Sequence, residues 1–108
     1  MLGPIMTALE SRFKTAVFAA GGCDTGAVLP ETDPINFAPH VKIPVLMING
    51  RYDFVFPLET CQVPLFNALG SPPQDKKQVL YDTGHAPPFL PMMRESLDWL
   101  DRYLGTVK

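Results

Sequence analysis

Two polar residues follow short apolar runs in this chain of 108 residues, and together they could carry out acid–base chemistry. Asp53 comes shortly after the apolar run at residues 45–48, and His85 comes shortly after a second run at residues 78–81. A carboxylate that hydrogen-bonds one imidazole nitrogen fixes the tautomer of the ring and leaves the other nitrogen free to take a proton. The pair therefore predicts a general base.

The two apolar runs are the elements that must position this pair. A continuous apolar run of this length between turn residues is typical of a strand buried on both faces of a parallel sheet. Catalytic groups in such sheets gather beyond the carboxyl ends of the strands, so Asp53 and His85 are expected to meet at one edge. Asp82 is an alternative orienting partner for His85. Because Asp82 lies at the same strand end as His85, the strand geometry favours Asp53.

The segments before this pair predict further elements. A short helix is predicted over residues 4–11 and a strand over residues 13–20, where the chain reaches two glycines. Residues 23–42 contain three prolines, and their apolar residues follow no sustained helical or strand spacing. This pattern predicts an irregular connection. Irregular loops of about twenty residues are uncommon in compact domains, and they are usually functional or belong to something larger.

The second half of the chain alternates strands and helices. Strands are predicted over residues 44–49 and 77–81, and the helical period of residues 57–70 is interrupted by Pro64, which should kink or split that helix. The last helix, closed by Gly105, is marked by four apolar residues, Met93, Leu97, Leu100 and Leu104. This order predicts one α/β domain over residues 1–108 with about three parallel strands and flanking helices.

Composition excludes several function classes. A net charge of -2 with scattered cations gives no footprint for nucleic acid or for an anionic membrane. No apolar run reaches the ~20 residues of a membrane span, and the first residues do not look like a signal peptide. Cys23 and Cys61 have no metal-binding spacing; free thiols are the default, and a disulfide stays open. We therefore expect a cytoplasmic protein with no cofactor, no metal, no nucleic-acid partner and no membrane partner.

Two motifs resemble a known family. The stretch Ile43-Pro-Val-Leu-Met-Ile-Asn-Gly-Arg-Tyr-Asp53, followed by Pro57, and the stretch Tyr81-Asp-Thr-Gly-His85 resemble the last strands of the α/β-hydrolase fold. The dienelactone-hydrolase and acyl-esterase-like branch is the most similar. The resemblance covers nearly all of the chain and implies a truncated α/β-hydrolase fold, the C-terminal part of the domain. It also implies that Asp53 is the acid of a catalytic triad and His85 its base.

The nucleophile of that family has no counterpart in this sequence. The family carries it in a Gly-x-Ser-x-Gly elbow, and no such motif occurs here. Cys23 stands in a crude echo of the elbow, Gly-Gly-Cys-Asp-Thr-Gly, with Thr25 where a glycine is needed. Ser71 is a second candidate, although its Gly-Ser-Pro-Pro setting is typical of a turn. A third possibility is a water molecule activated by His85, and general-base catalysis of this kind contributes roughly 10²–10⁴-fold.

These features leave different function classes open. One is a slow carboxylic-ester hydrolase for short-chain or activated esters, with a small ester as its substrate. Another is a catalytically inactive hydrolase fragment that acts only as a self-associating module, and a third is a subunit completed by a separate chain that carries the serine elbow. Because the resemblance leaves the strand near residues 15–20 without its neighbour, its exposed edge predicts a homodimer or higher oligomer.

Overall fold

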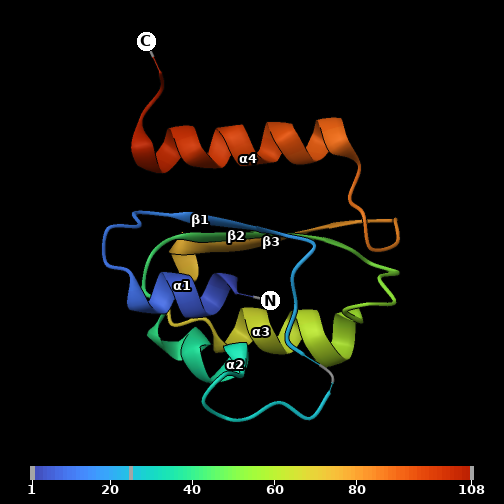
Figure 1. Ribbon diagram of the computed structural model, residues 1–108. Helices are drawn as coiled ribbons and strands as arrows, with labels where there is room; N and C mark the ends of the chain where they lie inside the picture. Colours follow the sequence, from blue (N-terminus) through green and yellow to red (C-terminus); the bar gives the residue numbers. More distant parts are fainter. Residues whose placement is uncertain (1, 25, 108) are drawn as a thin grey trace.

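The computed structural model describes residues 2–24 and 26–107, and it confirms the predicted fold class. Three parallel strands, β1 (Ala16–Ala19), β2 (Val45–Gly50) and β3 (Lys76–Tyr81), form one sheet in the order β1-β2-β3. Figure 1 shows α1 (Gly3–Leu9), α2 (Pro34–Phe37) and α3 (Val63–Ala68) beneath the sheet, and α4 (Phe89–Leu104) above it. The molecule therefore has three layers, with the sheet in the middle.

The central strand β2 carries the core. All six of its residues are buried, which explains why residues 45–48 are continuously apolar and do not alternate. Val45 and Met47 pack on the side of α1 to α3, together with Leu65. Leu46 and Ile48 pack on the side of α4. The sheet is thus covered on both faces, as the parallel arrangement requires.

The connection between β1 and β2 differs from the predicted irregular loop. It contains α2 and a 3₁₀ turn at Ala38–His40. The side chain of Asp33 caps α2 by accepting a hydrogen bond of 3.1 Å from the backbone N–H of Ile35. These turns are too short to show a period in the sequence, but they place Ala38 and Val41 in the core.

The helical segment between β2 and β3 changes type just before Pro64. It begins as a π-helical turn over Leu58–Gln62 and continues as α3. Proline has no backbone N–H, so the Thr60 carbonyl four residues earlier receives no helical hydrogen bond from it. The Cys23 thiol donates to that carbonyl instead, at 3.5 Å. Cys61 is fully buried in this segment.

The last helix packs on a different face from the one that its apolar spacing suggests. The buried residue of α4 is Trp99, and Met92 and Tyr103 pack beside it. The Trp99 indole N–H donates to the Thr15 hydroxyl at 2.8 Å, which ties α4 to the start of β1. Met93, Leu97 and Leu104 are 39%, 55% and 58% exposed. An apolar stripe of α4 therefore lies outside the core.

Among the described helices, none combines the length and the apolar character needed to cross a bilayer.

Candidate active site

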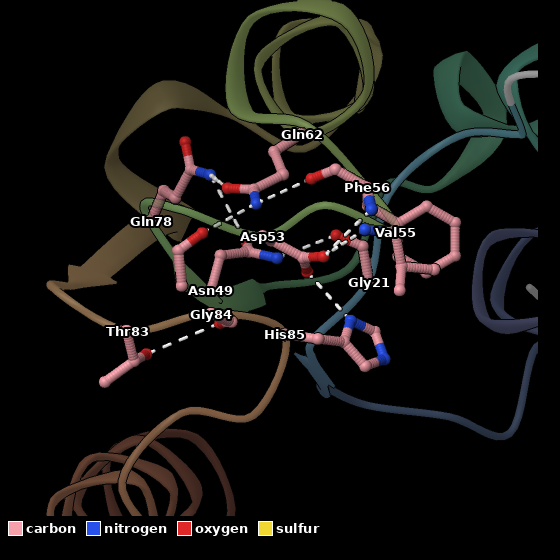
Figure 2. A network of polar contacts seen from close by, with 11 residues as sticks. Gly21, Asn49, Asp53, Val55, Phe56, Gln62, Gln78, Thr83, Gly84 and His85 are labelled. Atoms are coloured by element: carbon pink, nitrogen blue, oxygen red, sulfur yellow. Dashed lines mark hydrogen bonds and ion pairs between the residues drawn. The ribbon is translucent and has the colours of Figure 1, made fainter.

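Asp53 and His85 lie in hydrogen-bond contact at the carboxyl edge of the sheet. Asp53 follows β2, His85 follows β3, and Asp53 Oδ2 is 2.9 Å from His85 Nδ1. Figure 2 shows the imidazole standing beside the carboxylate, with its second nitrogen pointing away from Asp53. The contact expected from the two strand ends is therefore present.

The Asp53 carboxylate is held by more than the histidine. Its Oδ1 accepts hydrogen bonds from the backbone N–H groups of Val55 and Phe56, at 2.8 and 3.0 Å. Burial by itself would raise the pKa of Asp53, but the hydrogen bonds from Phe56, His85 and Val55 outweigh it and lower that pKa below its usual range. The carboxylate is thus ionised at neutral pH. An ionised carboxylate only accepts hydrogen bonds, so His85 donates from Nδ1 and keeps Nε2 for chemistry.

His85 is reachable from solvent while its partner is not. Its side chain is 41% exposed, whereas the side chain of Asp53 is fully buried. The ring of Phe56 lies against one side of the imidazole, with 5.9 Å between ring centroids. A buried orienting group behind an accessible ring is the arrangement that a general base requires.

Gly50 lets the two loops that carry the pair approach each other. A Cβ atom at Gly50 would lie 1.8 Å from the carbonyl oxygen of Gly84 and 2.6 Å from that of Thr83. The backbone N–H of Tyr52 donates to the Thr83 carbonyl at 3.0 Å across the same contact. Any side chain at position 50 would therefore separate the Asp53 loop from the His85 loop.

Asp82 does not orient the histidine. Its carboxylate pairs with the Arg51 guanidinium at 3.0 Å and is largely exposed to solvent. The Arg51 backbone N–H also donates to the Tyr81 carbonyl at 2.8 Å. Asp82 thus helps to join the ends of β2 and β3, and the alternative that it serves His85 is wrong.

A buried network of amide side chains lies behind the pair, and it was not identified from the sequence (Figure 2). Gln62 donates to the carbonyls of Gly50 and Phe56, at 2.9 and 2.8 Å, and so holds both ends of the Asp53 loop. Gln78 donates to Asn49 and Gln62, at 3.3 and 3.4 Å. The only sign of this network in the sequence is Asn49, an uncharged amide at the end of the apolar run in β2.

The same network reaches the segment that follows β1. Asn49 Nδ2 donates to the Gly21 carbonyl at 2.7 Å. A Cβ atom at Gly22 would lie 2.6 Å from Cβ of Phe56, so this segment passes close to the ring that contacts His85. Three strand ends are therefore joined at the site.

Cys23 lies at the correct edge of the sheet but is bonded elsewhere. Its backbone N–H donates to the Cys61 carbonyl at 3.4 Å, and its thiol donates to the Thr60 carbonyl. Burial, and after it the nearby Cys61, raise the pKa of the Cys23 thiol to about 11. The thiol is therefore protonated at neutral pH, whereas a thiolate is the reactive form of cysteine.

The structure does not bring Ser71 together with the pair. Ser71 is buried, and its hydroxyl donates to the carbonyls of Ile43 and Val41, at 2.6 and 3.3 Å. These carbonyls precede β2, whereas Asp53 and His85 follow the carboxyl ends of β2 and β3. Ser71 thus joins loops at the opposite end of the sheet.

A hollow of about 400 Å³ lies between β3 and α4 and does not include the pair; it is lined by Tyr81, Leu90, Pro91, Arg94 and Glu95. Within residues 2–24 and 26–107, no three histidine, cysteine or acidic side chains are grouped as a metal site requires.

Comparisons with known proteins place this fold. No protein-family model and no curated protein sequence matches the chain. A cold-adapted esterase from an Arctic intertidal metagenomic library is 25% identical, with a TM-score of 0.76 over 95% of this chain and 44% of the esterase. A Thermus thermophilus protein is 18% identical, with a TM-score of 0.76 over 98% of this chain and 51% of its own.

A third solved structure belongs to the branch that the two motifs resemble. A candidate dienelactone hydrolase from Klebsiella pneumoniae is 18% identical, with a TM-score of 0.70 over 96% of this chain and 47% of its own. The chain thus spans about half the length of each of these three structures. Its three parallel strands and flanking helices have the fold of the C-terminal part of an α/β-hydrolase.

Proposed function

We propose that the chain hydrolyses carboxylic esters, with His85 as general base and Asp53 as the residue that orients it. The observation that carries this proposal is the 2.9 Å contact between Asp53 Oδ2 and His85 Nδ1, which leaves Nε2 exposed at the sheet edge. The likeness to an esterase structure at 25% identity supports the same class of reaction.

The nucleophile in this proposal is water. Neutral His85 takes a proton from a water molecule at Nε2 while the water oxygen attacks the acyl carbon of the ester. Asp53 stabilises the imidazolium that forms, because its ionised carboxylate already accepts from Nδ1. The imidazolium then gives its proton to the departing alcohol oxygen, and the products are a carboxylic acid and an alcohol. Cys23 takes no part, since its thiol is protonated and donates to the Thr60 carbonyl.

The substrates that fit this mechanism are short-chain or activated esters. General-base catalysis alone contributes roughly 10²–10⁴-fold, which is enough to observe only for a good leaving group. The loop that carries Asp53 also exposes apolar side chains, Tyr52, Phe54 and Val55. These side chains offer contact to an aryl leaving group beside His85.

The test is hydrolysis of p-nitrophenyl acetate by wild type, by His85→Ala and by His40→Ala. Any exposed imidazole cleaves this ester slowly, so His40 is the matched control because it is the other histidine and is exposed on a 3₁₀ turn. We expect His85→Ala to lose most of the turnover, down to the slow rate of an ordinary exposed imidazole such as His40, and His40→Ala to keep nearly all of it. Equal losses in the two variants, or no loss in His85→Ala, would eliminate the proposal.

A second candidate function is a self-associating module without catalytic turnover. The observation that favours it is the unpaired edge of β1, at one side of a three-stranded sheet. Folded wild type that hydrolyses the ester no faster than His85→Ala would select this candidate over the first.

A further inference from the structure

Two cysteines from distant parts of the chain meet beside the loop that carries Asp53. Cys23 lies in the segment that follows β1, and Cys61 lies in the π-helical turn after β2. The backbone N–H of Cys23 donates to the Cys61 carbonyl at 3.4 Å. Residues that share such bonds in a sheet have Cα atoms about 5.5 Å apart, and disulfide-linked cysteines have Cα atoms about 4.4–6.8 Å apart. The backbone contact is therefore of the kind that a disulfide spans.

The two free thiols are directed to the same place. The Cys23 sulfur lies 3.5 Å from the carbonyl oxygen of Thr60, and the Cys61 sulfur lies 3.9 Å from the hydroxyl oxygen of the same residue. The Cys61 thiol is also near enough to interact directly with the Cys23 thiol, and this interaction adds to burial in raising the pKa of Cys23. Both sulfur atoms therefore lie in one small region around Thr60.

The two cysteines differ in their access to solvent. Cys23 is 8% exposed and Cys61 is 0% exposed, so a soluble oxidant meets the Cys23 sulfur first. The thiolate is the form that attacks a disulfide, and a pKa of about 11 leaves roughly one Cys23 thiol in three hundred ionised at about pH 8.5. The first step of any oxidation is therefore slow, whereas the second step occurs between two sulfur atoms that are already neighbours.

We propose that Cys23 and Cys61 form a reversible disulfide with oxidised glutathione, and that this disulfide restrains the Asp53 loop. The Cys23 thiolate attacks one glutathione sulfur, so the glutathione S–S bond breaks, a mixed disulfide forms and one glutathione thiolate leaves. The Cys61 thiolate then attacks the Cys23 sulfur, and the second glutathione thiolate leaves. The two protons of the protein thiols end on the two released glutathione molecules. The protein loses two electrons, and oxidised glutathione gains them.

The new bond connects two segments that both support the Asp53 loop. Gly22 precedes one cysteine, and a Cβ atom there would lie 2.6 Å from Cβ of Phe56. Gln62 follows the other cysteine and donates to the Phe56 carbonyl at 2.8 Å (Figure 2). The backbone N–H of Phe56 in turn donates to the Asp53 carboxylate at 3.0 Å. A covalent bond between the two segments therefore restrains the residue that helps to hold this carboxylate.

Oxidation also removes one hydrogen bond. The reduced Cys23 thiol donates to the Thr60 carbonyl, which receives no helical hydrogen bond from Pro64. A disulfide sulfur has no hydrogen to donate, so this carbonyl loses its donor. The crosslink, however, closes a loop of about forty residues, and the resulting restraint on the unfolded chain outweighs one weak thiol hydrogen bond. The oxidised protein is therefore the more stable form.

The first measurement is the mass of folded wild type after overnight incubation with oxidised glutathione at about pH 8.5. We expect a loss of about 2 Da, the mass of the two hydrogens that the thiols give up. Trypsin digestion without a reductant should then yield one linked pair of peptides, residues 15–42 and residues 52–76. Dithiothreitol should restore the reduced mass.

The second measurement compares the oxidised and reduced proteins by thermal unfolding and hydrogen exchange. The midpoint of the oxidised protein should be higher by at least about 5 °C, and dithiothreitol should remove this gain. Exchange at the backbone N–H of Phe56 should be slower in the oxidised protein. Cys23→Ser is the matched control, because its hydroxyl can still donate to the Thr60 carbonyl but cannot crosslink. Oxidised glutathione should leave the midpoint of this variant unchanged.

Circular dichroism checks that the control variant is folded, and Cys61→Ala replaces Cys23→Ser if it is not. Three results would overturn the proposal. The first is folded wild type in which both cysteines stay reduced or Cys23 carries only glutathione. The second is a disulfide that forms only in urea or that joins two chains. The third is a crosslink that changes neither the midpoint nor the exchange at Phe56. None of these measurements uses an ester, so their outcome is independent of the proposed hydrolysis.

Discussion

At the scale of single residues, the site depends on a carboxylate with three hydrogen-bond donors. Two backbone N–H groups and the imidazole of His85 surround Asp53, whose side chain is fully buried. A charge in such a position is stable only because each donor favours its ionised form. Asp53 therefore orients the histidine, and its ionisation also makes the free energy of unfolding depend on pH.

The first prediction concerns the acid stability that Asp53 provides. Its folded pKa is lowered, so its contribution to the free energy of unfolding is complete above the unfolded pKa and is lost as the pH falls through the folded pKa. The unfolded value for aspartate is about 3.9. Asp53→Asn should lower the stability by about 2 kcal/mol at pH 7, because a buried hydrogen-bonded charge is lost.

The variant should also flatten the pH dependence, so that the difference in stability between wild type and Asp53→Asn narrows as the pH falls below the unfolded pKa of about 3.9 and toward the lowered folded pKa. Urea titrations at pH 7, 5 and 3 measure both effects. A difference between the two proteins that is constant over this range would show that Asp53 does not titrate on unfolding.

The second prediction compares two glycines on the loops of the pair. Gly50→Ala should destabilise the protein by about 3 kcal/mol, since its Cβ would overlap backbone atoms that cannot move without separating the loops. Gly84→Ala should change the stability by less than about 0.5 kcal/mol, because no atom lies within 4 Å of its Cβ position. Thermal unfolding of the two variants provides the measurement, and equal midpoints would contradict the close approach at Gly50.

At the scale of elements, a π-helical turn and an amide network hold the Asp53 loop. Gln62 is the last residue of the π-helical turn and is fully buried. Its side chain reaches the carbonyls of Gly50 and Phe56, which are the two ends of the loop. The position of Asp53 therefore depends on the register of the helical segment that carries Gln62.

The third prediction tests that dependence. Gln62→Met has a similar volume but no donor, so two buried carbonyls and the amide of Gln78 lose a partner, at a cost of about 2–3 kcal/mol. Gln74→Met makes the same change at an exposed position and should be nearly neutral. Hydrogen exchange at the N–H of Val55 and Phe56 should be faster in Gln62→Met, and unchanged protection there would show that Gln62 does not hold the loop.

Some of these elements can be predicted from the sequence, and others cannot. The run at residues 45–48 is apolar throughout because β2 is covered on both faces, so the strand and the residue that follows it are predictable. The helices α2 and Ala38–His40 are not, because turns of three or four residues have no period.

The orientation of α4 was beyond the sequence for another reason. Its strongest apolar spacing marks the stripe that includes Leu97, whereas the sheet contacts Trp99. When a helix has two apolar faces, its sequence alone does not show which of them packs against the sheet. The amide network was likewise hidden, because Gln62 and Gln78 meet only when a helical turn and a strand are brought together.

At the scale of the whole molecule, the two sides of the sheet differ in character. Beside β3, charged residues of α4 line two shallow hollows. Beside β1, the sheet edge and the layers above and below it are apolar.

The fourth prediction follows from the second candidate function, self-association through the edge of β1 that lies at one side of the sheet. A folded dimer that dissociates on unfolding gains stability with protein concentration. The thermal midpoint of wild type should therefore rise between 1 and 100 µM, by several degrees on the scale of about 4–8 °C per kcal/mol for a domain of this size. A constant midpoint for wild type would contradict a dimer linked to folding.

His85 stands on a rim, beside an exposed loop and outside the hollow between β3 and α4. A base whose side chain is 41% exposed is approached from the solvent side, past the loop that exposes Tyr52 and Phe54.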